Sequence, residues 1–515
     1  MRKRRAMVGG AIIVAWLVGL ALLVRREYFR PQLERLAAAA AKVTPGTVYY
    51  GVMQGDRQVG FAQSQIDTGQ ATISVSDYLV ADFPIGGKAR RTSARTNVAL
   101  SRSLRVRQFD VAINLESGPL RAGGRVDGDS VLVFALSTGA EKPDSQRIAL
   151  SGPVLLPTLV PLAVALAETP KVGKHYVMPV LDPATMNAKD VTLDVRAEST
   201  FVVNDSAVFD SATARWRGVQ PARIRAWQVV ARDSGATSFS GWIDDQGRIV
   251  ETRQLGFVLR RLPYEVAFEN WKTEVHGSDL VSNDRDILET TAIAANKTMS
   301  RHIEALKVRL SGVSLAGYQI AGQGQSLRGD TLVIRRASDS AMLIDRKLPY
   351  RDRDRANSFP EPLIQAFDTS IVRLARQLRG NDRDARMVAE RINQWVHDSI
   401  ADRITFGVPS AVQVLKSRIG DCNEHTQLFV ALARAVGLPA RIAAGLAYVD
   451  GKFYYHAWPE VLLQDWVAVD PTFGQFPADA AHLRFVVGGL GRQTELLRLM
   501  GNLKIDVLAL NRDVR

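Results

Sequence analysis

One stretch of this 515-residue chain, residues 418–472, constrains its fold more than any other. Apolar residues recur there at three- and four-residue steps over 423–436, which predicts an amphipathic helix with one buried face. Asp421 stands where an N-cap is expected, and a Gly-Leu-Pro sequence ends the helix. Two segments follow, at 453–463 and 466–470, in which successive side chains would point to opposite faces, as they do in strands. The pattern predicts a helix packed against a sheet.

This stretch contains Cys422, the only cysteine in the chain. The cysteine stands at the predicted helix start, where unpaired amide groups and the helix dipole favour an anion. That placement predicts a nucleophilic thiol with a lowered pKa. A lone cysteine without such context is more often a small buried apolar residue, so the interpretation depends on the groups that fold beside it.

His456 and Asp470 lie in the two strand-like segments and supply an imidazole and a carboxylate. In an antiparallel pair they share a face only if the numbers of paired residues sum to an even value, as 456 and 470 do. A two-residue turn at 464–465 would pair residues with an odd sum and separate them. The sequence therefore predicts a three- or five-residue connection, or a bulge near Pro459, which cannot donate to a strand ladder.

Four motifs carry a family resemblance: Gly-Asp-Cys at 420–422, Leu-x-Arg-x-x-Gly-Leu-Pro-Ala-Arg at 432–441, His-Ala-Trp-x-Glu-Val at 456–461 and Trp-Val-x-Val-Asp-Pro-Thr at 466–472. With them, residues 346–490 resemble the transglutaminase-like superfamily of papain-type cysteine enzymes, in a membrane-anchored bacterial-type form. The resemblance implies an α+β domain in which Cys422 is the nucleophile, His456 the general base and acid, and Asp470 the group that orients His456. It implies no cofactor and no metal. Thr426 and Pro459 depart from the family's usual alanine and aliphatic residue.

The chemistry implied is attack of a thiolate on an amide carbonyl, which forms an acyl-thioester. Water as acceptor would make the protein a cysteine protease or amidase, and an amine would make it an acyltransferase, in both cases with a protein or peptide substrate. The backbone N–H of Cys422 is the first candidate for the oxyanion donor.

The alternative to an enzyme is a catalytically silent domain that binds a peptide or envelope component as a scaffold. His425, one helical turn after the cysteine, has no carboxylate partner in these motifs and is the weaker candidate base.

Composition bears on partners and location. The formal charge of +13 would suit a nucleic-acid partner. However, residues 1–30 carry seven basic residues against Glu27 alone, and no nucleic-acid-binding motif is present, so we expect no nucleic-acid partner.

Residues 6–24 form an uncharged apolar run of 19 residues flanked by arginines, which predicts a transmembrane anchor. The charge distribution places the N-terminus in the cytoplasm and the bulk outside, in the periplasm of a Gram-negative cell. An inverted anchor would give a cytoplasmic-facing protease.

The expected fold class is α+β, with an N-terminal transmembrane helix, a β-rich and largely antiparallel middle region, and a C-terminal transglutaminase-like domain. Helices are predicted at 361–378 and 384–400, a capping box of Ser410 and Gln413 predicts a third, residues 154–166 are read as a buried helix or loop, and 322–329 as a loop. The expected domains are an anchor at 1–30, a stalk at 31–46, a β-rich region at 47–270, a connector with strands at 271–345, the catalytic domain at 346–490 and an extension at 491–515.

Overall fold

The protein is described by a computed structural model that covers residues 43–514 except 70, 103, 117, 129, 139–143, 151, 153, 168, 183–186, 234–235, 255, 274–285, 301, 323, 343–346, 351–354, 362 and 405–409. The predicted membrane span at 6–24 and residues 31–42 of the predicted stalk lie outside these residues. Among the residues that are described, none of the helices combines the length and the apolar character needed to cross a membrane.

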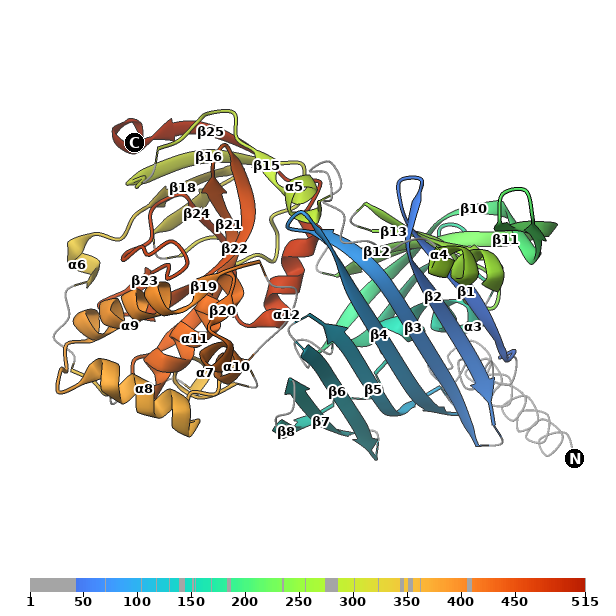
Figure 1. Cartoon of the computed structure of the whole chain (residues 1–515), viewed down its shortest axis with the longest axis horizontal. Coiled ribbons are helices and arrows are strands. Elements are labelled where there is room, and N and C mark those ends of the chain that lie inside the picture. Colours follow the sequence, from blue (N-terminus) through green and yellow to red (C-terminus); the bar gives the residue numbers. More distant parts are fainter. Residues whose placement is uncertain are drawn as a thin grey trace, which may run out of the picture.

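The described chain is mostly β, which corrects the expected α+β class with an N-terminal transmembrane helix (Figure 1). One antiparallel sheet of 14 strands dominates, in the order β8-β7-β6-β5-β4-β3-β2-β1-β14-β13-β12-β11-β10-β9. Almost every strand pairs with its neighbour in sequence, because short turns join successive strands into hairpins. The expectation of a largely antiparallel middle region is therefore right, but this sheet outweighs the helices. Its strands are β1 (Gly46–Gln54), β2 (Arg57–Thr68), β3 (Thr72–Ile85), β4 (Lys88–Ser101), β5 (Val106–Leu115), β6 (Gly118–Asp127), β7 (Val131–Thr138), β8 (Asp144–Ala149), β9 (His175–Asp182), β10 (Asn187–Asp210), β11 (Arg215–Asp233), β12 (Ala236–Ile243), β13 (Ile249–Gln254) and β14 (Phe257–Leu262).

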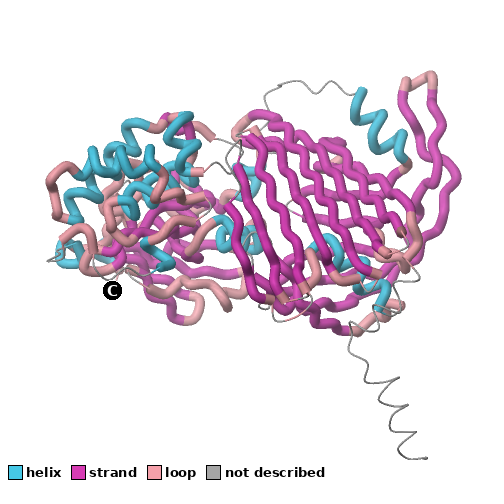
Figure 2. The backbone as a smooth tube through the Cα atoms, turned by 90° about the horizontal axis from the view of Figure 1, so that it is seen from below, coloured by secondary structure: helices cyan, strands magenta, loops and turns pink. Residues whose placement is uncertain are grey.

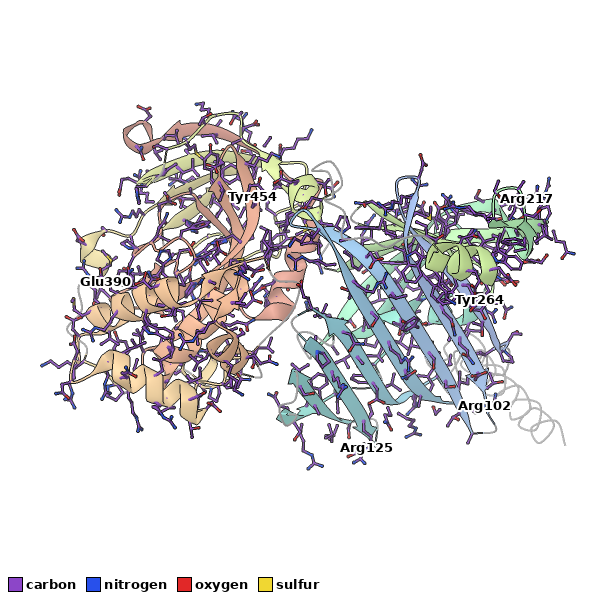
Figure 3. All side chains as sticks on the ribbon, viewed as in Figure 1. Arg102, Arg125, Arg217, Tyr264, Glu390 and Tyr454 are labelled. Atoms are coloured by element: carbon purple, nitrogen blue, oxygen red, sulfur yellow. The ribbon has the colours of Figure 1, made fainter. Side chains whose placement is uncertain are left out.

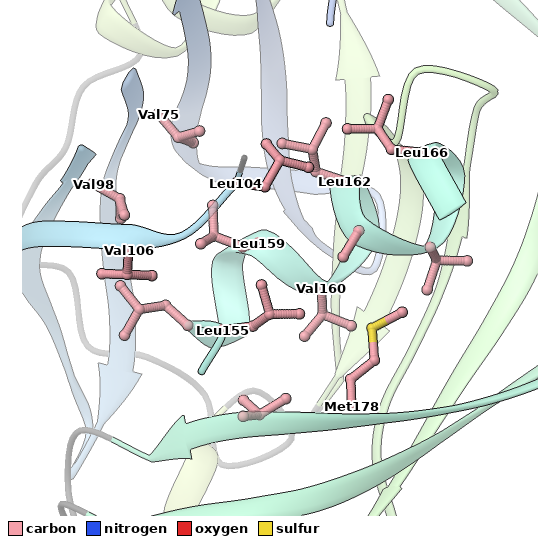
Figure 4. Close-up of a cluster of buried hydrophobic side chains, with 14 of the residues drawn as sticks. Val75, Val98, Leu104, Val106, Leu155, Leu159, Val160, Leu162, Leu166 and Met178 are labelled. Atoms are coloured by element: carbon pink, nitrogen blue, oxygen red, sulfur yellow. The ribbon is translucent and has the colours of Figure 1, made fainter. Parts of the chain in front are cut away.

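The core of this β-rich half forms where the sheet curls around η2 (Pro157–Leu159) and α3 (Val160–Ala167). Leu159 and Leu162 from this segment pack against Val98 of β4 and Met178 of β9 (Figure 4). The short helix is apolar around its circumference because strands cover it from more than one side. Residues 154–166, expected to be a buried helix or loop, are mostly buried and contain η2 and most of α3.

The C-terminal half holds most of the helices (Figure 2). Helix α11 (Cys422–Ala435) packs on a five-stranded sheet, and α8 (Thr369–Arg379), α9 (Ala385–Ser399) and α10 (Ala411–Ser417) pack on α11. The sheet has the order β15-β22-β21-β24, with β23 paired to β22, and comprises β15 (Ile293–Ala294), β21 (Ala440–Val449), β22 (Lys452–Leu462), β23 (Trp466–Ala468) and β24 (His482–Val487).

Two of the three predicted leading helices match the structure. Helix α9 begins after Asp384, and α10 begins with the predicted capping box, in which the Ser410 and Gln413 side chains each bond the other's backbone. The helix predicted from 361 instead begins at Thr369, because the Asp368 carboxylate accepts a hydrogen bond from the Ser370 amide at 2.8 Å and caps the helix there.

A second, four-stranded sheet supports the C-terminal half from residues far apart in sequence. Strand β16 (Ala305–Ser311) pairs with β25 (Lys504–Leu510) on one side and β18 (Thr331–Arg335) on the other. Strand β17 (Gln325–Arg328) pairs with β18, so the expected loop at 322–329 contains a strand. The remaining elements are η3 (Glu265–Glu269), α4 (Asn270–Thr273), α5 (Ile287–Thr291), α6 (Asp339–Met342), α7 (Arg355–Ser358), β19 (Ala401–Asp402), β20 (Ile419–Gly420), α12 (Leu490–Gln493), η4 (Thr494–Arg498) and η5 (Asn511–Asp513).

The β-rich half meets the C-terminal half at the turn between β3 and β4. The Gly87 amide donates to the carboxylate of Asp286, which caps α5, and Arg90 Nη2 donates to the Ile404 carbonyl at 3.0 Å. Helix α5 in turn holds β22, because Glu289 accepts a hydrogen bond from the Tyr454 hydroxyl at 3.1 Å (Figure 3).

Candidate active site

Helix α11 begins at Cys422, and its start is held by a reciprocal pair of side chains. The Asp421 carboxylate accepts from the Asn423 amide at 3.0 Å, and the Glu424 carboxylate accepts from the Asp421 amide at 2.9 Å. A Cβ atom at Gly420 would lie 2.2 Å from the Cβ of Glu424, so only glycine fits before this cap. The predicted N-cap is confirmed, and the Gly-Asp-Cys motif has a steric reason.

The start of α11 occupies a gap along the edge of β22. Strand β15 pairs with β22 at Phe453, and β23 pairs with it from Glu460 onward. Between these pairings the Thr426 hydroxyl donates to the Ala457 carbonyl at 3.1 Å, and the Ala457 amide donates to the sulfur of Cys422. The thiol therefore lies beside the residue that follows His456. The unusual threonine has a structural role, since it ties the helix to the strand.

The connection between β22 and β23 has the length that the parity argument requires. Leu462 pairs with Trp466, so residues 463–465 form a three-residue connection, and this prediction is confirmed. The Val469 amide then donates to the Pro459 carbonyl at 3.0 Å, which extends the pairing in the same register. His456 and Asp470 consequently lie on one face of the sheet.

The structure brings His456 and Asp470 into direct contact. His456 Nε2 lies 2.7 Å from Asp470 Oδ2, while Asp470 Oδ1 accepts from the amides of Thr472 and Phe473 at 2.7 and 3.1 Å. Burial raises the pKa of Asp470, but the two histidines that bond it outweigh this and hold that pKa well below its usual range. Because Nε2 of His456 is bonded to the carboxylate, Nδ1 is the ring nitrogen that remains for proton transfer with another group.

A second histidine, which the sequence did not single out, bonds the same carboxylate. His482 on β24 places Nε2 2.9 Å from Asp470 Oδ2 and Nδ1 3.1 Å from Asp479 Oδ1. Burial lowers the pKa of His482, but the hydrogen bonds and charges of the two carboxylates outweigh it and raise that pKa to about 9. His482 is therefore an imidazolium at neutral pH. Its only sequence signal is the Asp-x-x-His spacing, which is too common to assign a site.

The ligand atoms of His456, Asp470 and His482 lie within 4.8 Å of one another, which raises the question of a metal ion. Two ligands held at about 2.0–2.1 Å by a tetrahedral ion are separated by about 3.3 Å. The two N–O distances here are 2.7 and 2.9 Å, which are the distances of charge-assisted hydrogen bonds. The donor set is thus arranged to share protons around one carboxylate.

Aromatic rings enclose the imidazole of His456. The ring of Phe473 stacks on it with centroids 4.6 Å apart and planes 4° apart, and Trp458 stacks at 6.0 Å. Trp458 is buried, whereas Phe473 is 38% exposed and forms the outer cover. These contacts restrict His456 to the orientation that its bond to Asp470 selects.

The thiol of Cys422 differs from the sequence expectation. Burial raises its pKa well above the ordinary value, the carboxylates of Asp421, Glu424 and Asp470 raise it further, and only the Ala457 amide lowers it. The expected lowering by the helix start is wrong, because burial opposes the charged thiolate and the cap that holds the helix brings two carboxylates close to the sulfur. The resting thiol is neutral and needs a base to become a nucleophile.

His425 does not approach this network as a base. Its Nδ1 lies 2.7 Å from the Asp421 carbonyl, within the first turn of α11, and its side chain is buried. It strengthens the helix start, which agrees with its being the weaker candidate.

Comparison with known proteins identifies the family of the segment that carries this site. Residues 372–471 match the family model described as the transglutaminase-like superfamily. A solved structure of a candidate cysteine protease from Cytophaga hutchinsonii aligns with 15% identity and a TM-score of 0.28, over 41% of this chain and 85% of that one. A protein of a domain of unknown function from Brucella abortus aligns with 13% identity and a TM-score of 0.30, over 43% of this chain and 95% of that one. No curated protein gives a match.

Proposed function

Residues 372–471 form a transglutaminase-like domain, and on that basis we propose that the protein is a cysteine-dependent enzyme acting on amide bonds of peptides or proteins. The observation that carries the proposal is the 2.7 Å bond from His456 to Asp470, one residue from the amide that contacts the Cys422 sulfur. This arrangement provides a nucleophile, a base and a group that fixes the tautomer of the base.

In the proposed reaction His456 Nδ1 accepts the thiol proton while the sulfur of Cys422 attacks the carbonyl carbon of the amide. The oxyanion that develops accepts a hydrogen bond from the backbone N–H of Cys422 at the start of α11. The C–N bond then breaks, the amine leaves with the proton from His456, and an acyl-thioester remains on Cys422. Water or a second amine attacks the thioester and restores the thiol. Because burial and nearby carboxylates raise the pKa of the thiol, the reaction depends on His456 as the acceptor of the thiol proton.

Alkylation by iodoacetamide tests the proposal without knowledge of the substrate, since Cys422 is the only thiol. We expect pH-dependent alkylation that slows about 100-fold in His456→Ala, measured by mass spectrometry. The matched control is His175→Ala, because His175 also bonds an aspartate, Asp194 at 2.6 Å, but lies in the β-rich half. Equally slow alkylation in the wild type and His456→Ala would contradict an enzyme and favour the silent scaffold, which the raised pKa of the thiol would then explain.

A second experiment separates hydrolysis from transfer. The protein is incubated with a peptide library and a fluorescent primary amine, and products are identified by mass spectrometry. Shortened or deamidated peptides would indicate that water accepts the acyl group, and amine adducts would indicate transfer. Both products should vanish in Cys422→Ala.

A further inference from the structure

We infer that His482 is a positioning residue of this site: held by Asp479 on one side, it donates to Asp470 on the other and keeps that carboxylate ionised and directed at His456. The inference rests on the proposed function, because it assigns a role in the same proton-transfer network. His482 would not touch the substrate. It would act through Asp470.

The hydrogen bonds around Asp470 are the first support. Its side chain is fully buried, and an isolated carboxylate in such a place would bind a proton. Its four acceptor positions are instead filled by two backbone amides on Oδ1 and by two imidazole N–H groups on Oδ2. Without His482, Oδ2 would keep only the hydrogen bond from His456, whose charge changes during the proposed reaction.

The two histidines are not interchangeable. His482 has both nitrogens engaged by carboxylates, so neither can accept a proton from a thiol. His456 has only Nε2 engaged in a hydrogen bond of this network. Their ring centroids are 5.7 Å apart, so a charge on one ring acts directly on the other. One network thus contains a mobile proton carrier and a fixed cation.

The charges of the network favour this division of roles. With His482 protonated and His456 neutral, the two carboxylates of Asp470 and Asp479 leave one net negative charge. Protonation of His456 during attack neutralises the network, which favours that step. The charged or titratable groups that face His482 are His456, Asp470 and Asp479 in contact, and Arg335, Arg336, Glu460, Asp465 and Arg484 across an adjoining cavity of about 330 Å³.

Close packing of the strands places His482 where it is needed. Gly445 of β21 lies between β22 and β24 and pairs with His456 on one side. A Cβ atom at this glycine would lie 1.9 Å from the Leu483 carbonyl, so β24 approaches β21 more closely than a side chain would permit. His482 precedes Leu483 on that strand. The close approach of β24 to β21 therefore places His482 within hydrogen-bonding distance of Asp470.

The test compares the pH dependence of iodoacetamide alkylation of Cys422 in the full chain with that of His482→Gln. We expect alkylation near pH 7 to slow about 10- to 100-fold, the effect of losing one charge-assisted hydrogen bond. The acid limb of the profile should also move to higher pH, because removal of the His482 cation leaves more negative charge around the base. Asp479→Asn should move the limb in the same direction by less, and it serves as the second variant if His482→Gln does not fold.

The outcomes separate this inference from the proposed function. An unchanged profile in both folded variants, or a uniform loss of rate without movement of the acid limb, would overturn the positioning role. His175→Gln, which breaks the His–Asp pair of the β-rich half, should leave the profile unchanged. If His456→Ala slows alkylation and His482→Gln does not, only this inference fails. If His456→Ala has no effect, the proposed function fails first.

Discussion

The two halves of the molecule are assembled from strands in different ways. In the β-rich half, strands from β1 to β8 and from β9 to β14 pair in order along the chain. In the C-terminal half, β16 pairs with β25 almost 200 residues later, and the site joins residues from α11, β22, β24 and the turn after β23. Local pairing produces an extended sheet around one helix, whereas distant pairing brings titratable groups together. The proposed chemistry accordingly uses only residues of the C-terminal half.

The largest expected effect is the loss of the nucleophile. Cys422→Ala should reduce turnover of peptide amides by at least about 10³-fold, because the proposed covalent step cannot occur. Stability should change little, since the residue is small and only partly buried. Turnover is followed by mass spectrometry of peptide products. Full activity in this variant would show that the chemistry does not take place at α11.

Two fully buried phenylalanines provide a matched pair across the halves. Phe109→Ala in the β-rich core and Phe429→Ala on α11 should each lower the free energy of unfolding by about 3–5 kcal/mol. Only Phe429→Ala should also slow the His456-dependent alkylation of Cys422, because it loosens the helix that carries the thiol. Chemical denaturation and alkylation of the native protein measure the two effects. Equal slowing in both variants would show that the β-rich half shapes the site.

The stability of the C-terminal half should depend on pH through His482. Its pKa is about 9 in the folded protein against 6.5 for an ordinary histidine, so the folded state binds this proton more tightly. The resulting stabilisation is complete below about pH 6.5 and is lost as the pH rises to about 9. Denaturation at several pH values should show a smaller loss over this window in His482→Gln than in the wild type. Parallel curves would mean that His482 is not protonated in the fold.

The smallest effect concerns the contact between helix and strand. Thr426→Val keeps the shape of the side chain but removes the hydrogen bond to the Ala457 carbonyl, which should cost about 1 kcal/mol of stability and slow alkylation severalfold. Thr426→Ser retains the hydroxyl and is the control. Wild-type behaviour of Thr426→Val together with losses in Thr426→Ser would show that the shape of residue 426, and not its hydroxyl, holds the thiol beside His456.

Much of the site can be read from local patterns. The Gly-Asp-Cys helix start, the capping box at Ser410 and the three-residue connection after β22 depend on residues within a few positions of one another, so their backbone geometry limits the outcome. The same holds for the hairpins of the β-rich half and for the buried helix α3. The start of α8 was placed too early because an apolar stripe continues through residues that lie outside the helix.

Sequence patterns alone established where the thiol, the imidazole and the carboxylate stand and that their strands can share a face. Folding in three dimensions added His482, the pairing of β16 with β25 and the raised pKa of the thiol. The physical reason is the distance in sequence over which each interaction acts. Caps, turns and strand parity depend on residues that are close neighbours in the chain. Burial, and charges brought close from distant segments, exist only once the whole C-terminal half has packed.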